Sequence, residues 1–334
     1  MGINPGIIVL RSDRPLEESV FRKISLFCNV REDCVIENIT LPNLYEAPLM
    51  LEKSGFSDVV CRELHIEAPE PDLTDWTAMV ERIHNRSEEV HIGLVGKYVK
   101  LHDAYLSVAE AMNHAGYEEN AFVKIHWIDS EGITRETVND VLHGLDGIIV
   151  PGGFGSRGIE GMILSAKYAR ENRIPYFGIC LGMQIAVIEF ARHVLGLTDA
   201  HSGEFDEQCA HRVIDFMPGQ SGEIDKGGTL RLGSYPCCIK AGTKMEECYG
   251  SEQIHERHRH RYEFNNEYRG ELEKAGLVIS GTSPDGRLVE TIELPEHPFF
   301  IGVQFHPEFK SRPNQPHPLF KGFISAALKQ TEEK

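Results

Sequence analysis

From residue 90 to residue 194 the chain alternates between two hydrophobic periods. Short apolar runs that are typical of buried strands occur at residues 90–98, 123–129, 146–153 and 175–180. Between and after these runs, apolar residues recur at helical spacing at residues 104–117, 136–145, 158–172 and 184–194. Strands that alternate with helices across short turns predict a parallel sheet covered by helices on both faces.

Beyond residue 200 the pattern becomes richer in strands. We expect strands at residues 230–240, 256–265, 277–294 and 299–306, and a closing helix at residues 318–330. The sequence SPDG inside the third of these runs predicts a hairpin. Residues 201–209 and 217–228 are polar and glycine-rich, which predicts loops over a site rather than core.

The first 89 residues have a different pattern of predicted elements. Residues 6–13 predict one strand, and residues 16–28 and 44–64 predict helices, which is too little sheet to close a core alone. Residues 68–89 are rich in proline and charge, as in a connector. We therefore expect a fragment at residues 1–67, a linker at residues 68–89 and a main domain at residues 90–334.

Charge and cysteine usage exclude some classes of function. A formal net charge of −17 argues against a nucleic-acid partner, because phosphate binding needs a basic face. No apolar run approaches the ~20 residues of a membrane span, and the first residues do not resemble a signal peptide. The eight cysteines are scattered along the chain, which favours reduced thiols and a cytoplasmic protein.

The segment GICLGMQ carries the strongest chemical signal. It places Cys180 on the turn between a buried strand and a helix, with Gly178 and Gly182 allowing a sharp bend, as in the nucleophile elbow of hydrolases. A thiol at a helix N-terminus ionises more readily, because the helix dipole and the free N–H groups favour the thiolate. Cys180 is therefore the candidate nucleophile.

A cysteine nucleophile needs a base, a group that orients the base, and oxyanion donors. FFIGVQFHPEF supplies His306 at a strand end and Glu308 two residues later, on the same face if the chain is extended. The backbone N–H groups of Gly153, in PGGFG, and of Leu181 are the candidate oxyanion donors. A lone buried cysteine is usually a small hydrophobe, but the three segments together, in this order, are far more specific.

Two glycine-containing patterns resemble nucleotide-binding motifs, but neither predicts a nucleotide site. Gly153, Gly155 and Gly158 fit G-x-G-x-x-G, but they follow the third strand of the unit, and no acidic residue ends the next strand, so a dinucleotide site is not expected. GLVGK is too short for a phosphate-binding P-loop.

The strand ERHRHRYEFN should place three arginines on one face and two histidines on the other. The arginines Arg257, Arg259 and Arg261 favour a carboxylate clamp or an interdomain contact over metal binding by the neighbouring histidines.

Taken together, PGGFGSRGIEGM, GICLGMQ and VQFHPEF resemble the class I (triad) glutamine amidotransferases. GGTLRLG and ERHRHRYE point within that family to the CTP synthases, whose amidoligase domain ends in segments similar to GIIVLRSDRPL and RKISLFCNV. The resemblance implies a doubly wound, flavodoxin-like α/β glutaminase domain, preceded by a fragment of a P-loop-type synthetase domain.

The resemblance also implies roles for single residues. Cys180, His306 and Glu308 match the family's catalytic triad, and Gly153 and Leu181 match its oxyanion hole. The remaining matches are Gly153, Gln184, Glu204 and Arg261 for glutamine, Phe154 and the loop before GGTLRLG for allosteric GTP, and Lys23 for UTP or CTP. No metal ligands are expected in this chain.

Family members convert UTP to CTP with ATP, Mg²⁺ and ammonia from L-glutamine, and they are homo-oligomers. Glutamine hydrolysis itself needs no cofactor. The glycine-rich ATP loop and the acidic Mg²⁺ ligands of the family are not found here, so we expect an N-terminally truncated chain that cannot make CTP alone. Three alternatives stay open: a separate N-terminal synthetase chain, a catalytically silent accessory subunit, and a γ-glutamyl peptidase that uses the same triad.

Overall fold

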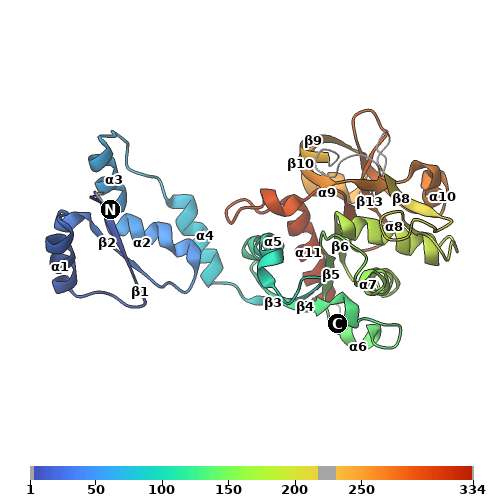
Figure 1. Cartoon of the computed structure of the whole chain (residues 1–334), viewed down its shortest axis with the longest axis horizontal. Coiled ribbons are helices and arrows are strands. Elements are labelled where there is room, and N and C mark those ends of the chain that lie inside the picture. The colour runs from blue at the N-terminus through green and yellow to red at the C-terminus, as the bar shows by residue number, and fades with distance from the viewer. Residues whose placement is uncertain (1–3, 217–230, 333–334) are drawn as a thin grey trace. The chain divides into compact units, whose positions relative to one another are not determined.

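The computed structural model describes residues 4–216 and 231–332. The chain divides into two compact units, Met1–Asn85 and Arg86–Lys334, each of which is described by itself (Figure 1). This boundary differs from the predicted division, which placed a linker at residues 68–89. That segment contains a helix, α4 (Thr74–His84), which belongs to the first unit. The predicted domain roles stay predictions.

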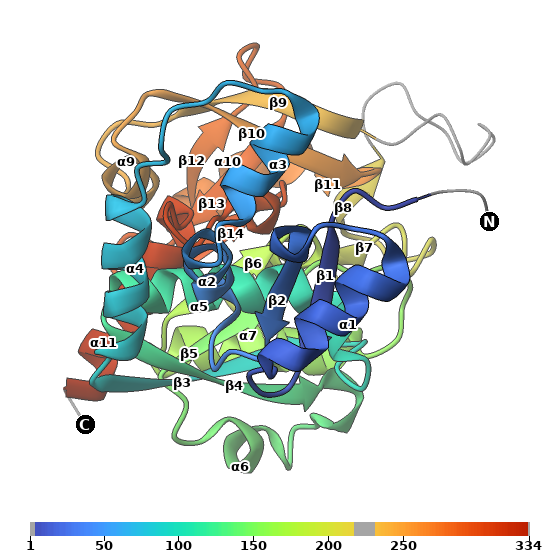
Figure 2. The same ribbon diagram turned by 90° about the vertical axis from the view of Figure 1, so that its left-hand side faces the viewer.

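The first unit contains a parallel pair of strands, β1 (Ile8–Ser12) and β2 (Val35–Ile39), which run side by side (Figure 2). Its helices are α1 (Glu18–Cys28), α2 (Ala47–Lys53), α3 (Phe56–Leu64) and α4, with short 3₁₀ turns η1 (Glu32–Cys34) and η2 (Leu44–Glu46). The expectation of one strand was wrong. VIENI is apolar at only three of its five positions, so its sequence period is weak, and pairing with β1 stabilises it.

The apolar core of the first unit is small. It is built around Cys34, Ile36 and Val59. Helix α1 buries none of its residues, and Leu26 and Phe27 are exposed. The buried apolar residues of this unit come from β2 and from the helices α3 and α4, with Cys34 just before β2.

The second unit is built on a mixed sheet. Within the described ranges its nine strands follow the order β10-β9-β12-β13-β14-β6-β5-β3-β4. Their bounds are β3 (Glu88–Gly96), β4 (Ala121–Asp129), β5 (Gly147–Val150), β6 (Tyr176–Ile179), β9 (Arg231–Ile239), β10 (Gln253–His260), β12 (Val278–Thr282), β13 (Val289–Glu293) and β14 (Phe300–Val303). A smaller sheet joins β7 (His201–Ser202), β8 (Arg212–Phe216) and β11 (Tyr262–Phe264).

Strands β4, β3, β5, β6 and β14 are parallel to one another, which confirms the predicted parallel core. Numbered along the chain, their spatial order is 2-1-3-4-5, the order of flavodoxin-like doubly wound sheets. The strands from β13 to β10 extend this sheet in antiparallel fashion. The predicted SPDG hairpin joins β12 and β13 and is confirmed.

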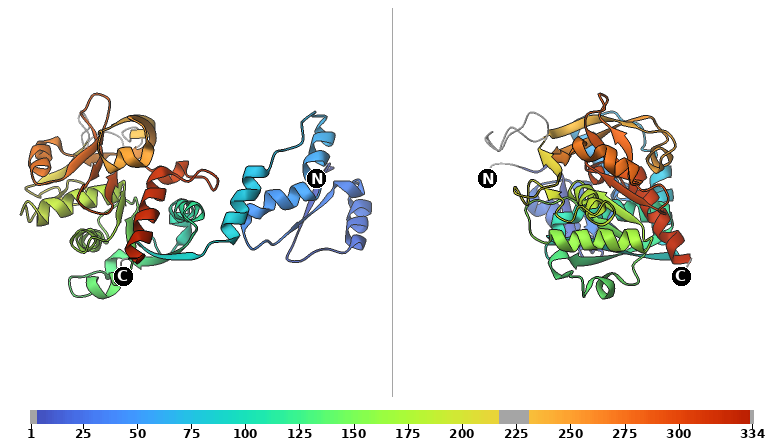
Figure 3. Two further views of the ribbon diagram at one scale, coloured as in Figure 1. Left: turned by 180° about the vertical axis from the view of Figure 1, so that it is seen from behind. Right: turned by 90° about the vertical axis from the view of Figure 1, so that its right-hand side faces the viewer.

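Helices cover both faces of the sheet because successive strand residues point to opposite sides. In β5, Ile148 and Val150 pack with the helices α7 (Ile159–Glu171) and α8 (Leu181–His193), whereas Ile149 packs on the other side. That other side is covered by α5 (Leu106–Glu118) and α11 (Pro318–Glu332), which lie beside each other (Figure 3).

The remaining helices are short. They are α6 (Val138–Leu142), α9 (Lys244–Tyr249) and α10 (Arg269–Lys274), together with the 3₁₀ turns η3 (His102–Tyr105), η4 (Ser130–Gly132), η5 (Asn266–Tyr268) and η6 (Pro307–Lys310). The loop predicted at residues 217–228 lies outside the described residues. Among the helices that the structure describes, none has the length and apolar character needed to cross a membrane.

Candidate active site

Cys180 lies between β6 and α8 in a backbone conformation that few residues adopt. Its φ is 53° and its ψ is −99°, which costs about 1–3 kcal/mol and marks a strained turn. Gly182 makes the turn possible, because a Cβ there would overlap the carbonyl oxygen of Val150 on β5. The predicted strand–turn–helix placement of the thiol is confirmed.

The start of α8 and the loop after β5 place the backbones of Leu181 and Gly153 in the same cavity as Cys180. Leu181 is the first residue of α8, so its N–H is one of the amides that lack an intrahelical acceptor. Gly153 lies close by, since a Cβ built on it would be 3.4 Å from the Leu181 side chain. At Gly152 a Cβ would lie 2.9 Å from the His306 ring, so only glycine leaves room for the imidazole.

His306 and Glu308 form a buried pair. Nδ1 of His306 lies 2.8 Å from Oε1 of Glu308. The predicted geometry was wrong, because His306 and Glu308 do not lie on an extended chain. Pro307 begins the 3₁₀ turn η6, and this turn folds the carboxylate back under the imidazole.

The surroundings of the His306 imidazole favour its protonated form. Burial alone would lower its pKa, but the Cys180 sulfur and the Glu308 carboxylate together raise the pKa of His306 to about 10. Cys180 and Glu308 both interact with the His306 ring, as expected for a cysteine nucleophile served by an imidazole that a carboxylate orients.

Two cavities meet at Cys180. The larger measures about 320 Å³ and is lined by Tyr98, Asp103, Ala104, Tyr105, Ser107, Val108, Pro151, Gly152, Gly153, Phe154, Cys180, Arg259, His306, Glu308 and Phe309. The smaller, about 180 Å³, is formed by Gly153, Phe154, Cys180, Leu181, Gln184, Glu204, His260, Arg261 and Tyr262. The structure thus brings all the residues predicted for glutamine to one small cavity beside the sulfur.

Glu204 lines the smaller cavity, and Lys97 lies close enough to Glu204 for their charges to interact. Burial raises the pKa of Glu204, against the lowering effect of the Gly155 N–H at 3.4 Å and of Lys97 and Arg261. Burial also lowers the pKa of Lys97 to about 8, while Glu204 opposes that change. Lys97 Nζ donates to the carbonyls of Phe154, at 3.2 Å, and Gly155, so it holds the PGGFG loop in place.

The arginine-rich strand is only partly as predicted. In β10, Arg257 and Arg259 are exposed while His258 and His260 are buried, as alternation requires. Arg261 departs from the pattern, because β10 ends at His260 and the following bend turns Arg261 into the smaller cavity.

Arg259 lies over Phe154 with its guanidinium 5.8 Å from the ring centroid. No group of three or more metal-ligating side chains is close enough to hold a metal ion within residues 4–216 and 231–332.

Lys23 is not among the residues that line either cavity. It is exposed on α1 in the first unit, and its predicted role toward UTP or CTP stays a prediction. Phe154 is 52% exposed at the mouth of both cavities, and its predicted link to GTP also stays a prediction.

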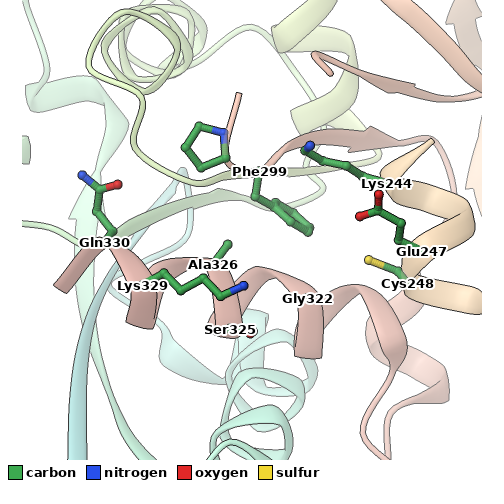
Figure 4. A pocket seen from close by; sticks show the side chains of 10 residues that line it. Lys244, Glu247, Cys248, Phe299, Gly322, Ser325, Ala326, Lys329 and Gln330 are labelled. Atoms are coloured by element: carbon green, nitrogen blue, oxygen red, sulfur yellow. The ribbon is translucent and has the colours of Figure 1, made fainter. Parts of the chain in front are cut away.

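A third hollow lies between α9 and α11 and does not include Cys180 (Figure 4). It measures about 330 Å³ and is lined by Lys244, Glu247, Cys248, Pro298, Phe299, Gly322, Ser325, Ala326, Lys329 and Gln330. Burial raises the pKa of Cys248 to about 12, and Glu247 and Glu293 add to the effect. All eight cysteines are unpaired, as predicted.

Sequence reasoning missed two residues that help to build the site. Lys97 was considered only as part of a phosphate loop, although it follows the carboxyl end of β3, where sites in parallel sheets gather. Gln304 was overlooked inside the apolar run before His306. Its signal was a polar residue at a fully buried strand end.

Comparisons with known proteins agree with this geometry. Residues 100–326 match the family model for Glutamine amidotransferase class-I, and residues 1–66 match the model for CTP synthase N-terminus. The CTP synthase of Carboxydothermus hydrogenoformans is 58% identical over 329 residues, which is 98% of this chain and 62% of that protein. The CTP synthase of Listeria innocua is 55% identical over 328 residues, with the same shares covered.

Among solved structures, the glutaminase domain of Trypanosoma brucei CTPS with bound acivicin is similar. The TM-score is 0.68 and the identity is 42%, over 72% of this chain and 94% of that one.

The chain spans about 62% of the length of the curated relatives it matches. The predicted truncation stays a prediction, because a partial match does not tell where a natural chain begins. The similarity of residues 1–66 to a CTP synthase N-terminus does not by itself test the predicted P-loop-type fragment. The match over residues 100–326 is nevertheless long enough to assign the family: the chain belongs to the class-I glutamine amidotransferases.

Proposed function

We propose that this chain hydrolyses L-glutamine to glutamate and ammonia at Cys180, as the glutaminase half of a CTP synthase. The observation that carries the proposal is the convergence on one sulfur of an imidazole–carboxylate pair, a helix start and a small cavity with groups for both ends of an amino acid. None of these groups needs a metal ion or a cofactor.

The first half of the reaction forms a thioester. The Cys180 thiolate attacks the side-chain carbonyl carbon of glutamine, and the oxyanion accepts hydrogen bonds from the N–H groups of Gly153 and Leu181. Each such donor is typically worth about 3 kcal/mol in the transition state. His306 gives its proton to the amide nitrogen as the C–N bond breaks, and ammonia leaves.

The second half restores the thiolate. His306, now neutral, takes a proton from water, which attacks the thioester carbonyl. The C–S bond breaks, glutamate leaves, and the proton stays on His306. Glu308 keeps the imidazole oriented through both halves, because its 2.8 Å contact fixes Nδ1 and leaves the other ring nitrogen for the proton transfers.

The smaller cavity suits a single amino acid, since about 180 Å³ is below the usual 300–1,000 Å³ of drug-sized sites. Arg261 would bind the α-carboxylate and Glu204 the α-ammonium group. Nε2 of Gln184 already donates to the Tyr262 carbonyl at 3.0 Å and to Gln304 Oε1 at 3.2 Å. Gln184 therefore has only its oxygen left to offer, which also suits the ammonium group.

The whole protein would then use the ammonia to convert UTP to CTP with ATP and Mg²⁺, as a homo-oligomer or with a separate synthetase chain, in the cytoplasm. In the described part of the chain no cluster of side chains fits Mg²⁺, so no step above runs through ATP or the metal ion. GTP would act at the larger cavity, where the half-exposed ring of Phe154 and the Arg259 guanidinium could hold a purine base.

Glutamate release by the purified full chain, with and without GTP, tests this proposal. We expect turnover of glutamine that exceeds turnover of γ-glutamyl dipeptides, because the smaller cavity leaves little room beyond one residue. Faster cleavage of the dipeptides would favour a γ-glutamyl peptidase. Absence of both activities, with co-purification of a synthetase chain, would favour the accessory-subunit alternative.

A further inference from the structure

Behind Cys180 lies a buried amide that the proposed mechanism does not use. Gln304 follows β14, the strand next to β6, and its side chain is fully buried. Its Nε2 donates a hydrogen bond to Sγ of Cys180 at 3.6 Å. Its backbone N–H donates to the carbonyl of Glu290 at 2.8 Å, so the residue is fixed at both ends.

A second amide sets which end of Gln304 faces the sulfur. Gln184 Nε2 donates to Gln304 Oε1 at 3.2 Å and to the carbonyl of Tyr262 at 3.0 Å. A primary amide has two N–H donors on one side and an acceptor oxygen on the other. Because the Gln304 oxygen accepts from Gln184, its N–H group must point toward Cys180.

Such a donor matters most when the sulfur is charged. A hydrogen bond to an ionised acceptor is about twice as strong as one between neutral groups, and a buried site has little water to replace it. His306 faces the sulfur from another direction and must move its proton to the substrate during the reaction. The Gln304 amide does not transfer its proton during the reaction, so its hydrogen bond can stabilise the thiolate throughout.

We propose that Gln304 is a catalytic residue that stabilises and aims the Cys180 thiolate through its Nε2–H, with Gln184 as the positioning residue that sets the orientation of the Gln304 amide. The proposal rests on the proposed role of Cys180 as nucleophile, but its test needs no glutamine. The other charged and titratable groups around the two cavities at the sulfur are Lys97, Tyr98, Asp103, Tyr105, Glu204, Arg259, His260, Arg261, Tyr262, His306 and Glu308.

The test compares Gln304→Met, which keeps the length of the side chain but removes the donor, with Gln315→Met, a matched change at an exposed glutamine. The rate of Cys180 alkylation by iodoacetamide is measured against pH on the full chain, with the modified peptide counted by mass spectrometry. We expect the midpoint of the profile to move up by about one pH unit in Gln304→Met, with alkylation at pH 7 about tenfold slower. Gln315→Met should match the unchanged chain.

Superimposable profiles for Gln304→Met and the unchanged chain would overturn the proposal. If Gln304→Met does not fold, as judged by its thermal transition, Gln184→Leu replaces it. That change frees the Gln304 amide to turn, so a smaller upward shift is expected, and no shift would again overturn the proposal.

Turnover separates this proposal from the proposed function. With glutamine as substrate, Gln304→Met should lower kcat about tenfold and change KM less than twofold, because Gln304 contacts the sulfur rather than the amino-acid cavity. An alkylation shift in a chain that never hydrolyses glutamine would support the role of Gln304 and contradict the glutaminase proposal. Turnover without any shift would do the reverse.

Discussion

Cys180 and Cys248 each line a hollow of similar size, about 320 Å³ for the larger cavity at Cys180 and about 330 Å³ at Cys248. The two thiols lie at opposite ends of helices. Cys180 precedes the first residue of α8, whereas Cys248 lies in the last turn of α9, where the helix dipole disfavours a negative charge. Burial, the largest cause, and the carboxylates of Glu247 and Glu293 together raise the pKa of Cys248 to about 12.

The groups that surround the two sulfurs also differ. Cys180 has an imidazole and an amide N–H beside its sulfur, while the charges that act on Cys248 mostly oppose ionisation. A hollow and a thiol are therefore not enough to make a nucleophile. Donors and a base must be placed around the sulfur, and parallel strands that end at one edge of the sheet do this at Cys180.

The largest expected effect separates the two thiols directly. Cys180→Ala should reduce glutamine hydrolysis at least about 10⁴-fold, as loss of a nucleophile does in other triads. Cys248→Ala is the matched control, with activity within about twofold of the unchanged chain. The measurement is glutamate release at saturating glutamine, and comparable losses in the two variants would break the comparison.

Removing the base should cost less than removing the nucleophile. His306→Asn should lower kcat by about 10³-fold, within the range found for general acid–base groups. It should also slow alkylation of Cys180 at pH 7, because the cation that favours the thiolate is gone. An unchanged alkylation rate at Cys180 would mean that His306 does not act on the sulfur.

The orienting carboxylate should give a smaller effect. Glu308→Gln keeps the shape of the side chain, and we expect kcat to fall by about 10²-fold because the imidazole loses charge stabilisation. The contact that this change weakens is the 2.8 Å bond to Nδ1 of His306. The readout is kcat with KM measured alongside, and a change confined to KM would place Glu308 with substrate binding.

Some features of the site and the fold could be predicted from the sequence, and others could not. The elbow at Cys180 was predictable because a strand period, a helix period and two glycines meet there within a few residues. Lys97 was not, because its role depends on the carbonyls of Phe154 and Gly155, which only the fold brings near. Strand β2 was missed because its few apolar positions become a strand only when paired with β1.

His306 and Glu308 show a third case. Their pairing was correctly predicted from spacing, but the stated geometry was wrong, since η6 is a 3₁₀ turn rather than extended chain. Spacing of two residues is compatible with both conformations. Only the packing of the turn under the imidazole decides between them.

The smallest expected effect concerns the region around Cys248, where we expect a substitution to change the free energy of unfolding rather than glutamine hydrolysis. His297 lies before Phe299, a wall of that hollow, and Nε2 of His297 donates to the Ala169 carbonyl at 3.1 Å. Burial lowers the pKa of His297 to about 4. The unfolded chain, with a histidine pKa near 6.5, therefore binds one more proton than the folded chain between pH 4 and 6.5.

The stability that neutral His297 contributes is thus present above pH 6.5 and is lost as pH falls toward 4, by about 1.4 kcal/mol per pH unit. In His297→Gln the dependence of the free energy of unfolding on pH in this window should weaken by that amount, while glutamine hydrolysis at pH 8 stays within about twofold. Denaturant unfolding at several pH values measures this. An unchanged slope would show that His297 is not held neutral.

The central claim is that one thiol of eight is built as a nucleophile for glutamine. The most direct measurement treats the full chain with an electrophilic glutamine analogue and locates the adduct by peptide mass spectrometry, with and without GTP. The account predicts one adduct, on Cys180, that excess glutamine prevents and that is absent from Cys248. An intact Cys180 that is never labelled, or labelling of Cys248 at a similar rate, would contradict it.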